Sequence, residues 1–359
     1  MPLPGRARGP TIVTAFDVVA LGESMVTFLP SRPGRLADVP SFTRGIGGAE
    51  SNVACVLAAA GHSVQWVSRV GADGFGDHLV DAITAYGVDT SAVRRDPARP
   101  TGIYFRTAGD RATDAHEVAY YRAGSAASAM AVDNVDLDAV RAGRVLHLSG
   151  ITAALSADCL GLMRALTARR PGRPLVSFDV NHRPGLWRDT AGPRVLLDLA
   201  RGADIVFVGE DEARDAWGLR GAGAIRDALP EPDVLVVKYG KGGAVMFDRD
   251  VEGTEDADGT ATLVGALRVD VVAAVGAGDA FAAGFLSATL RGLPAKDRLR
   301  HGHLMAAAAL TVPGDLAAPP SRDHADRLAA LDDQAWETLR LGPGWTEAVT
   351  RADEEVRTP

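Results

Sequence analysis

Apolar residues along the chain fall into short runs separated by longer, partly polar stretches. The runs predict buried strands over 16–23, 62–71, 144–150, 174–181, 203–209 and 232–240. The stretches between them predict helices over 50–61, 73–88, 156–170, 190–201 and 210–217. Near-continuous Val/Leu/Ile strands that alternate with helices indicate a mostly parallel sheet with helices on both faces. Ligands of such sheets gather at the carboxyl ends of the strands.

Three segments depart from this alternation. Residues 101–108 and 116–124 alternate apolar and polar positions, which predicts an antiparallel pair forming an accessory flap. Residues 232–240 and 243–248 flank Lys241 and Gly242 as a hairpin. Residues 267–275, LRVDVVAAV, predict a further strand that leads into Gly276 and a helix of small residues, and 295–312 predict one more helix.

The two ends of the chain lack this periodicity. Residues 1–15 carry Pro, Gly and Arg and are expected to form a flexible N-terminal arm. Residues 331–359 are acidic and contain Trp336 and Trp345, so a C-terminal helix pair and a frayed tail both remain open. We therefore expect one large α/β domain over 16–330 and a C-terminal extension over 331–359.

The composition and charge of the chain argue against several classes of binding partner and cellular location. The formal net charge of −8 gives no general attraction to nucleic acid or to anionic lipid, so neither partner is expected. The two cysteines, Cys55 and Cys159, are 104 residues apart by number and suit a reducing compartment better than a disulfide scaffold. No run of about 18 apolar residues predicts a membrane span, and no signal peptide is evident. The expected location is the cytoplasm.

The stretch GAGD at 276–279 allows three interpretations: a dinucleotide loop, a helix cap and a phosphoryl-transfer site. A dinucleotide loop needs a small residue where Phe281 stands and a strand where 295–312 predict a helix, so hydride transfer is disfavoured. Asp is a good N-cap, but a cap does not require Gly276 and Gly278 ahead of it. Those glycines allow close approach to amides at a helix start, where Asp279 would take a proton from a hydroxyl.

GAGDAFAAG at 276–284 resembles the second signature of the ribokinase-like (pfkB) carbohydrate kinases, and residues 47–76 resemble the first. The pair occurs in the family's order, and the resemblance covers about residues 16–325. It implies a doubly wound α/β fold with a small β-sheet lid, which matches the flap. Catalysis would then belong to Asp279 as base, with Gly276, Ala277 and Gly278 holding the transferring phosphoryl group.

Several further stretches resemble 2-keto-3-deoxygluconate kinases within that family. They are 22–25, GGAE at 47–50, TGIYFR at 101–106, YYRAGSA at 120–126, HLSGIT at 147–152 and FDVNHRPGLW at 178–187. A sugar acid carries a carboxylate, which the planar fork of arginine suits. The resemblance implies a set of substrate-binding residues: Gly47, Gly48, Asn52, Tyr104, Tyr120, Arg122 and Arg183.

The resemblance also implies ATP and Mg²⁺ as cofactors. The residues expected near the nucleotide are Lys238, Gly240, Lys241, Gly242, Gly243 and His303. Glu212 would act on the metal through water, and an acidic residue favoured at a helix start is the competing explanation. Asp315 matches a Gly-Asp pair near the rim of the family's active site.

Other side chains are expected to be structural. Arg106 should be solvated on the flap, Tyr121 should pack on the face opposite Tyr120, and His147 and His182 should take core or supporting roles. The lid strands suggest a homodimer or a higher oligomer.

Three positions depart from the family pattern. Ala273 replaces the first aspartate of the second signature, Gly209 replaces the asparagine of N-x-x-E, and His303 replaces an asparagine.

Taken as a whole, the resemblance implies an ATP-dependent kinase for the terminal hydroxyl of 2-keto-3-deoxygluconate. The alternatives are a kinase for fructose, ribose or 2-keto-3-deoxygalactonate, and a pseudokinase that binds ligand without turnover.

Overall fold

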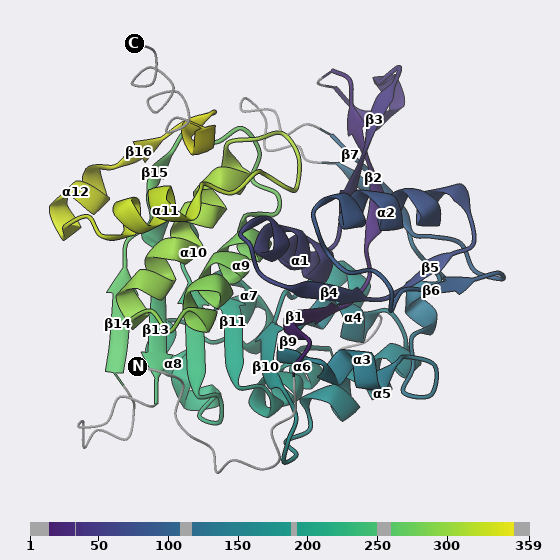
Figure 1. Ribbon diagram of the computed structural model, residues 1–359, viewed down its shortest axis with the longest axis horizontal. Helices are drawn as coiled ribbons and strands as arrows, with labels where there is room; N and C mark the ends of the chain where they lie inside the picture. The colour runs from purple at the N-terminus through teal and green to yellow at the C-terminus, as the bar shows by residue number, and fades with distance from the viewer. Residues whose placement is uncertain (1–13, 33, 108–116, 188–191, 250–259, 348–359) are drawn as a thin grey trace.

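The computed structural model describes residues 14–32, 34–107, 117–187, 192–249 and 260–347. The arm expected over 1–15 lies outside the described residues except for its last two positions, and residues 348–359 of the C-terminal extension lie outside them as well. Among the described residues, no helix has the length and apolar character needed to cross a membrane. The arrangement of the elements is shown in Figure 1.

The main sheet has eight strands in the order β14-β13-β12-β11-β10-β9-β1-β4. Strands β4 to β12 of this sheet run parallel to β1, and β13 and β14 are antiparallel to their neighbours. The bounds are β1 Phe16–Leu21, β4 Val64–Val67, β9 Gly143–Ser149, β10 Leu175–Asp179, β11 Ile205–Gly209, β12 Val234–Lys238, β13 Ala244–Asp248 and β14 Thr260–Val264. The chain runs outward from β1 to β4 and then returns to β9, so the crevice between β1 and β9 is where ligands are expected.

Helices cover both faces of this sheet, as predicted (Figure 1). One face carries α1 Ala49–Ala59, α2 Gly74–Ala85, α9 Ala277–Leu290, α10 Ala295–Leu310, α11 Arg322–Ala329 and α12 Asp333–Thr338. The other carries α3 Leu137–Arg141, α4 Gly150–Ala154, α5 Ala157–Thr167, α6 Gly192–Gly202, α7 Glu210–Trp217 and α8 Ala222–Ala228. A separate hydrophobic cluster fills each side, and the doubly wound α/β architecture is confirmed.

The lid is a separate four-stranded sheet in the order β3-β2-β7-β8, and it stands clear of the main sheet in Figure 1. Its strands are β2 Met25–Pro30, β3 Phe42–Gly47, β7 Ile103–Arg106 and β8 Val118–Tyr121. The antiparallel pairing of β7 with β8 confirms the predicted flap. Strands β2 and β3 were not predicted, because two glycines interrupt the pattern of β3 and a proline ends β2.

The strand predicted over 267–275 is wrong. Only β15 Arg268–Val269 is a strand, and it pairs with β16 Arg340–Leu341 outside the main sheet. Beyond it the backbone is irregular, with Val271 37% and Val272 41% exposed. The amides of Val272 and Ala273 instead donate to the Leu310 carbonyl at the end of α10, at 2.7 and 3.3 Å. Tertiary contacts have here overridden the β preference of the valines.

The C-terminal extension is folded onto the domain as far as residue 347. Trp336 on α12 is 2% exposed and Trp345 is 8% exposed, and both belong to the cluster shared with α1, α9 and α10. A helix followed by the short strand β16 therefore replaces the frayed tail within the described part of this segment.

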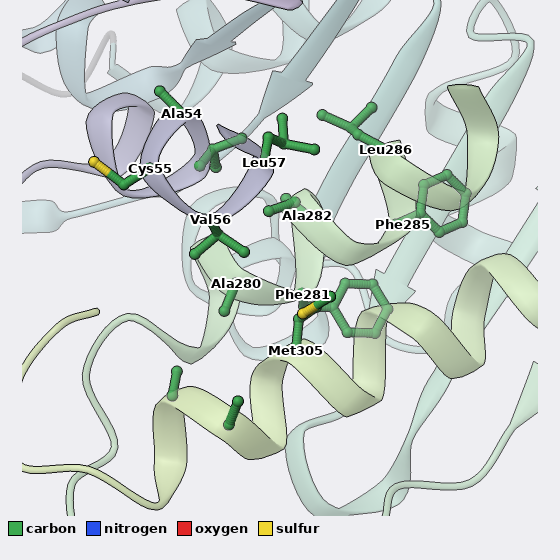
Figure 2. Close-up of a cluster of buried hydrophobic side chains, with 14 of the residues drawn as sticks. Ala54, Cys55, Val56, Leu57, Ala280, Phe281, Ala282, Phe285, Leu286 and Met305 are labelled. Carbon is green, nitrogen blue, oxygen red and sulfur yellow. The ribbon is translucent and has the colours of Figure 1, made fainter. Parts of the chain in front are cut away.

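Helices α1, α9 and α10 pack through small residues. Figure 2 shows Val56 and Leu57 of α1 facing Ala280 and Ala282 of α9. A Cβ added at Gly284 of α9 would lie 2.3 Å from the His301 carbonyl oxygen of α10. Glycine is therefore required where the two helices cross, and the crossing holds the start of α9 in place.

Candidate active site

Asp279 lies in the first turn of α9, at the carboxyl side of the main sheet. Gly276 is the N-cap of this helix with φ 75°, so Asp279 is its third residue. No side-chain cap bond forms at the start of α9, and the helix-cap interpretation of Asp279 is wrong. The first amides of a helix have no intrahelical acceptor, so those of Ala277 and Gly278 are available to an anion beside this carboxylate.

Asn52 on α1 holds the Asp279 carboxylate. Its Nδ2 donates to Asp279 Oδ2 at 2.8 Å, across 227 residues of sequence. The packing of α1 on α9 places the two helix starts side by side and so allows this contact. Asn52 was expected to contact the substrate, but in the structure it contacts Asp279, the predicted base, and is 3% exposed.

Glu50 fixes the start of α1 against the end of β9. Its Oε1 accepts from the Ser149 amide at 3.1 Å, from the Ser149 hydroxyl at 2.8 Å and from the Thr152 hydroxyl at 2.7 Å. A Cβ added at Gly22 would lie 2.1 Å from the Glu50 carboxyl carbon, so this approach needs glycine. Burial raises the pKa of Glu50, despite these hydrogen bonds.

Lys238 and Asp179 form an ion pair at the carboxyl ends of β12 and β10. The distance from Lys238 Nζ to Asp179 Oδ2 is 2.9 Å, and Lys238 Nζ would lie 3.7 Å from a Cβ at Gly278. The predicted phosphate-side lysine therefore adjoins the predicted anion site. Asp179 was missed by sequence analysis, although a carboxylate at the end of a predicted buried strand was a usable signal.

Burial and the neighbouring polar groups together set the pKa of Asp279. Burial is the largest influence and raises the pKa of Asp279 to about 8; the Asp179 and Asp315 carboxylates add to the rise. The Asn52 hydrogen bond and the Lys238 charge oppose it. Burial lowers the pKa of Lys238, but Asp179, Glu212 and Asp279 more than offset that effect and leave the pKa raised. A carboxyl whose pKa lies near neutrality is suited to accept a proton from a substrate hydroxyl.

A second network joins the lid to the loop after α10. Tyr104 Oη donates to Asp315 Oδ2 at 2.9 Å, and Arg106 Nη2 lies 2.9 Å from Asp315 Oδ1. Arg106 is 3% exposed, so the expectation of a solvated Arg106 is wrong: its charge is buried because Asp315 compensates it. A Cβ at Gly47 would lie 2.4 Å from Tyr104 Oη, and one at Gly276 would lie 2.2 Å from the Asp315 carbonyl oxygen.

The two arginines assigned to the substrate each have a carboxylate partner. Arg122 pairs with the buried Glu23, and its guanidinium carbon lies 5.8 Å from the centroid of the Tyr120 ring. Arg183 Nη1 lies 3.3 Å from Glu212 Oε1, and the Arg183 side chain is 56% exposed.

Tyr120 is 53% exposed on the same lid face as Tyr104, with ring centroids 5.5 Å apart. Asn181, between Asp179 and Arg183, has φ 39° and a buried Oδ1 without a partner among the described residues.

The remaining side-chain expectations have mixed outcomes. Tyr121 does lie on the face opposite Tyr120, with an edge contact to Phe105, yet it is 64% exposed rather than packed. His147 and His182 are buried, as expected, and His147 Nδ1 lies 3.0 Å from Ser177 Oγ. Burial lowers the pKa of His147 to about 4, so this ring is neutral at physiological pH.

The predicted nucleotide turn connects β12 to β13. Gly240 has φ 54° and Gly243 has φ 103°, and Lys241 is exposed at its tip. The antiparallel pairing of β12 with β13 confirms the predicted hairpin. His303 on α10 is 8% exposed and its Nε2 lies 3.3 Å from the Val264 carbonyl oxygen; burial lowers its pKa to about 4.

Glu212 turns back on its own helix. Its Oε2 accepts from the Gly209 amide at 2.9 Å at the start of α7, as the helix-start explanation expects. Burial raises the pKa of Glu212, against the lowering effect of Lys238. Among the described residues, no group of three or more His, Cys, Asp or Glu side chains forms a metal-binding cluster.

Comparison with known proteins identifies the class. The profile of the pfkB family carbohydrate kinases matches residues 15–322. The chain is 35% identical over 313 residues to the 2-dehydro-3-deoxygluconokinase of Bacillus subtilis, covering 86% of this chain and 93% of that protein. It is 33% identical to the 2-dehydro-3-deoxygluconokinase of Thermoproteus tenax, covering 87% and 94%. The crystal structure of a PfkB protein from Polaromonas sp. JS666 has a TM-score of 0.75 at 34% identity, covering 87% and 99%.

The chain therefore belongs to the pfkB family of carbohydrate kinases. It is an ATP-dependent sugar kinase with the ribokinase-like fold that its two signature segments indicated.

The raised pKa of Asp279 makes a prediction about stability. The pKa of this carboxyl is about 8 in the folded protein, against the ordinary aspartate value of 3.8 that applies to an unfolded chain. The free energy of unfolding therefore falls as the pH rises from 3.8 to 8, because the unfolded chain releases the proton more readily. Asp279→Asn should therefore raise the free energy of unfolding by roughly 1–3 kcal/mol at pH 8 and by little at pH 4.5. Thermal melts at both pH values measure this difference.

Asp158→Asn is the matched control, because Asp158 is an exposed acidic residue in the first turn of α5. Its melting temperature should differ from that of the wild type by similar amounts at both pH values. An Asp279→Asn effect that does not grow with pH would contradict the raised pKa.

Proposed function

We propose that the chain transfers the γ-phosphoryl group of ATP to the terminal hydroxyl of 2-keto-3-deoxygluconate. The observation that carries this proposal is the Asp279 carboxylate, held by Asn52 at 2.8 Å at the start of α9, with a pKa raised to about 8. Asp279 accepts the hydroxyl proton, while the amides of Gly276, Ala277 and Gly278 stabilise charge on the phosphoryl group in flight. ATP supplies the group that is transferred.

The side chains around the site fit an anionic nucleotide. Gly278 leaves open space at the start of α9, and Lys238 Nζ lies beside it. Gly240 has nothing within 4 Å of an added Cβ, so the turn of Gly240, Lys241 and Gly243 offers backbone to phosphate oxygens. His303 lies close to this turn, with its Nε2 3.3 Å from the Val264 carbonyl oxygen, and it is assigned to the adenine end of the nucleotide. Mg²⁺ would be held mainly by phosphate oxygens, with Glu212 acting through water.

The sugar acid is supported by the residues on the site-facing side of the lid. Tyr104 and Tyr120 offer hydroxyls from β7 and β8. Gly47 and Gly48 let Tyr104 Oη and the Glu23 carbonyl oxygen approach the backbone just ahead of α1, which brings the lid close to the start of this helix. Arg122 and Arg183 would bind the carboxylate and the keto-hydroxyl edge. Two relatives named 2-dehydro-3-deoxygluconokinase, at 33% and 35% identity, favour this substrate over fructose. The cytoplasm, where ATP is available, is the compartment this function implies.

A coupled ADP-release assay tests the substrate. With ATP and Mg²⁺ in excess, kcat/KM should be highest for 2-keto-3-deoxygluconate among a panel of 2-keto-3-deoxygalactonate, fructose, ribose and adenosine. Arg183→Gln should raise KM for the sugar acid about tenfold while changing KM for ATP little, because a charge-assisted contact is lost. Arg201→Gln on α6, at an arginine whose side chain is 42% exposed and pairs with Glu231, is the matched control.

The panel also separates the alternatives. A preference for a neutral sugar would contradict the sugar-acid proposal and leave the kinase intact. Binding without turnover of any member would favour the pseudokinase, for which Ala273 and Gly209 at two signature positions are the specific observations.

The outer face of the lid supports assembly as a homodimer or a higher oligomer. Phe28 and Phe105 stack at 4.6 Å, Phe42 contacts Phe105 edge-on at 5.2 Å, and Tyr121 is 64% exposed beside them. An aromatic face of this kind on a projecting sheet suits a second copy of the same lid.

Tyr121→Asp should then lower the molar mass measured by light scattering after size exclusion to that of a single chain. Val132→Asp, at a position 43% exposed outside the lid strands, should leave the mass unchanged. An unchanged mass for Tyr121→Asp, or a wild type that is already monomeric, would contradict assembly through this face.

A further inference from the structure

Residues 332–345, here termed the C-terminal strap, pack on the nucleotide side of the domain. The strap contains α12, β16 and Trp345, and in Figure 1 it lies over α10 beside β15. Nothing in the reaction described above uses it. Its contacts nevertheless converge on the segment between the nucleotide turn and the start of α9.

Trp336 makes the central contact of the strap. Its indole Nε1 donates to the Gly265 carbonyl oxygen at 3.0 Å, and its ring lies 6.5 Å from that of His303. The guanidinium carbon of Arg300, on α10, lies 4.7 Å from the centroid of the Trp336 ring. The same guanidinium donates to the Ala329 carbonyl oxygen at 2.7 Å and to Asp333 Oδ1 at 2.7 Å, so the start of the strap is fixed to α10.

The Gly265 backbone, in turn, lies against the nucleotide turn. A Cβ added at Gly243 would lie 2.2 Å from the Val264 carbonyl oxygen and 2.8 Å from Gly265 Cα. No side chain therefore separates the two segments. A shift of Gly265 away from Trp336 would move the backbone that supports Gly243 and the turn ahead of it.

The strap also holds the chain that leads to the catalytic turn. Strand β16 pairs with β15, and the Asp270 amide donates to the Leu341 carbonyl oxygen at 2.9 Å. Arg340 and Asp270 add an ion pair at 2.5 Å. The amide of Ala273, three residues beyond Asp270, donates to the Leu310 carbonyl oxygen at the end of α10, and Gly276 follows three residues later. The irregular segment 265–275 is thus held from outside the main sheet.

We propose that the C-terminal strap is a positioning element of the nucleotide site, and that Trp336 is its principal positioning residue. The strap sets the position of residues 264–270 against the Gly240–Gly243 turn, and none of the contacts described above involves a residue assigned to the sugar. Its loss should weaken nucleotide binding and leave sugar binding nearly unchanged. This inference rests on the nucleotide site of the proposed function.

The test compares two tryptophan variants of the full chain. Trp336→Phe keeps a ring in place and removes the hydrogen bond to Gly265. Trp345→Phe removes the same atoms from a second buried tryptophan of the strap, whose Nε1 has no hydrogen-bond partner among the described residues. Binding of the non-hydrolysable analogue AMP-PNP with Mg²⁺ is measured by titration calorimetry, and KM for ATP and for the sugar acid is measured by ADP release.

The expected result is a weaker Kd for AMP-PNP and a higher KM for ATP in Trp336→Phe, each by about three- to tenfold, as the loss of one hydrogen bond allows. KM for the sugar acid should stay within about twofold of the wild type. Trp345→Phe should match the wild type in all three quantities. Melting temperatures establish that each variant is folded. If Trp336→Phe does not fold, Leu341→Ala, which loosens β16 against β15, takes its place with the same expectations.

Three results would each overturn the positioning role of the strap. They are equal effects of the two tryptophan variants, an unchanged Kd for AMP-PNP in Trp336→Phe, and a rise in KM for the sugar acid equal to the rise in KM for ATP. A wild type that binds AMP-PNP but phosphorylates no sugar would overturn the proposed function alone, because the calorimetric comparison still decides the inference. A wild type that binds no AMP-PNP would overturn both.

Discussion

The packing of α1 against α9 is the interaction on which the active site depends. Asn52 and Asp279 are 227 residues apart in sequence, and their hydrogen bond exists only because the two helices start side by side. Small residues allow this close packing: alanines line both helices, and Gly284 of α9 lets the backbone of α10 pack closely against α9. Glu50 anchors the start of α1 to β9 in the same turn that carries Asn52. Residues of the first signature segment therefore hold the Asp279 carboxylate in place.

The ends of the parallel strands contribute the charges that surround this contact. Asp179 at the end of β10 and Lys238 at the end of β12 pair at 2.9 Å, and the pair adjoins Gly278. Asp315 approaches from the loop after α10, with Arg106 and Tyr104 of the lid on its carboxylate. The site is thus assembled from the main sheet, two helix starts and the lid. The main sheet through Asp179 and Lys238, the start of α1 through Asn52, and the loop after α10 through Asp315 each contribute a group that shifts the pKa of Asp279.

The sequence was sufficient where a feature is local, and insufficient where it depends on distant contacts. Strand and helix alternation, the β7–β8 flap and the hairpin at Lys241 follow from periodicity and turn residues, and the structure confirms them. The run LRVDVVAAV has the composition of a buried strand, yet it lies outside the main sheet because β16 and the end of α10 hold it. Arg106 looked like a solvated lid residue, and only the fold reveals the carboxylate that buries it. The roles of the individual substrate and nucleotide residues stay predictions.

The most direct test of the account is the turnover of Asp279→Asn, a variant that keeps the shape and the Asn52 contact but removes the base. We predict that kcat for 2-keto-3-deoxygluconate falls by about 10²- to 10⁴-fold, with KM for the sugar acid and for ATP changed little. Asp158→Asn on α5 should turn over like the wild type. Turnover of Asp279→Asn close to that of the wild type would contradict the central role of this carboxylate.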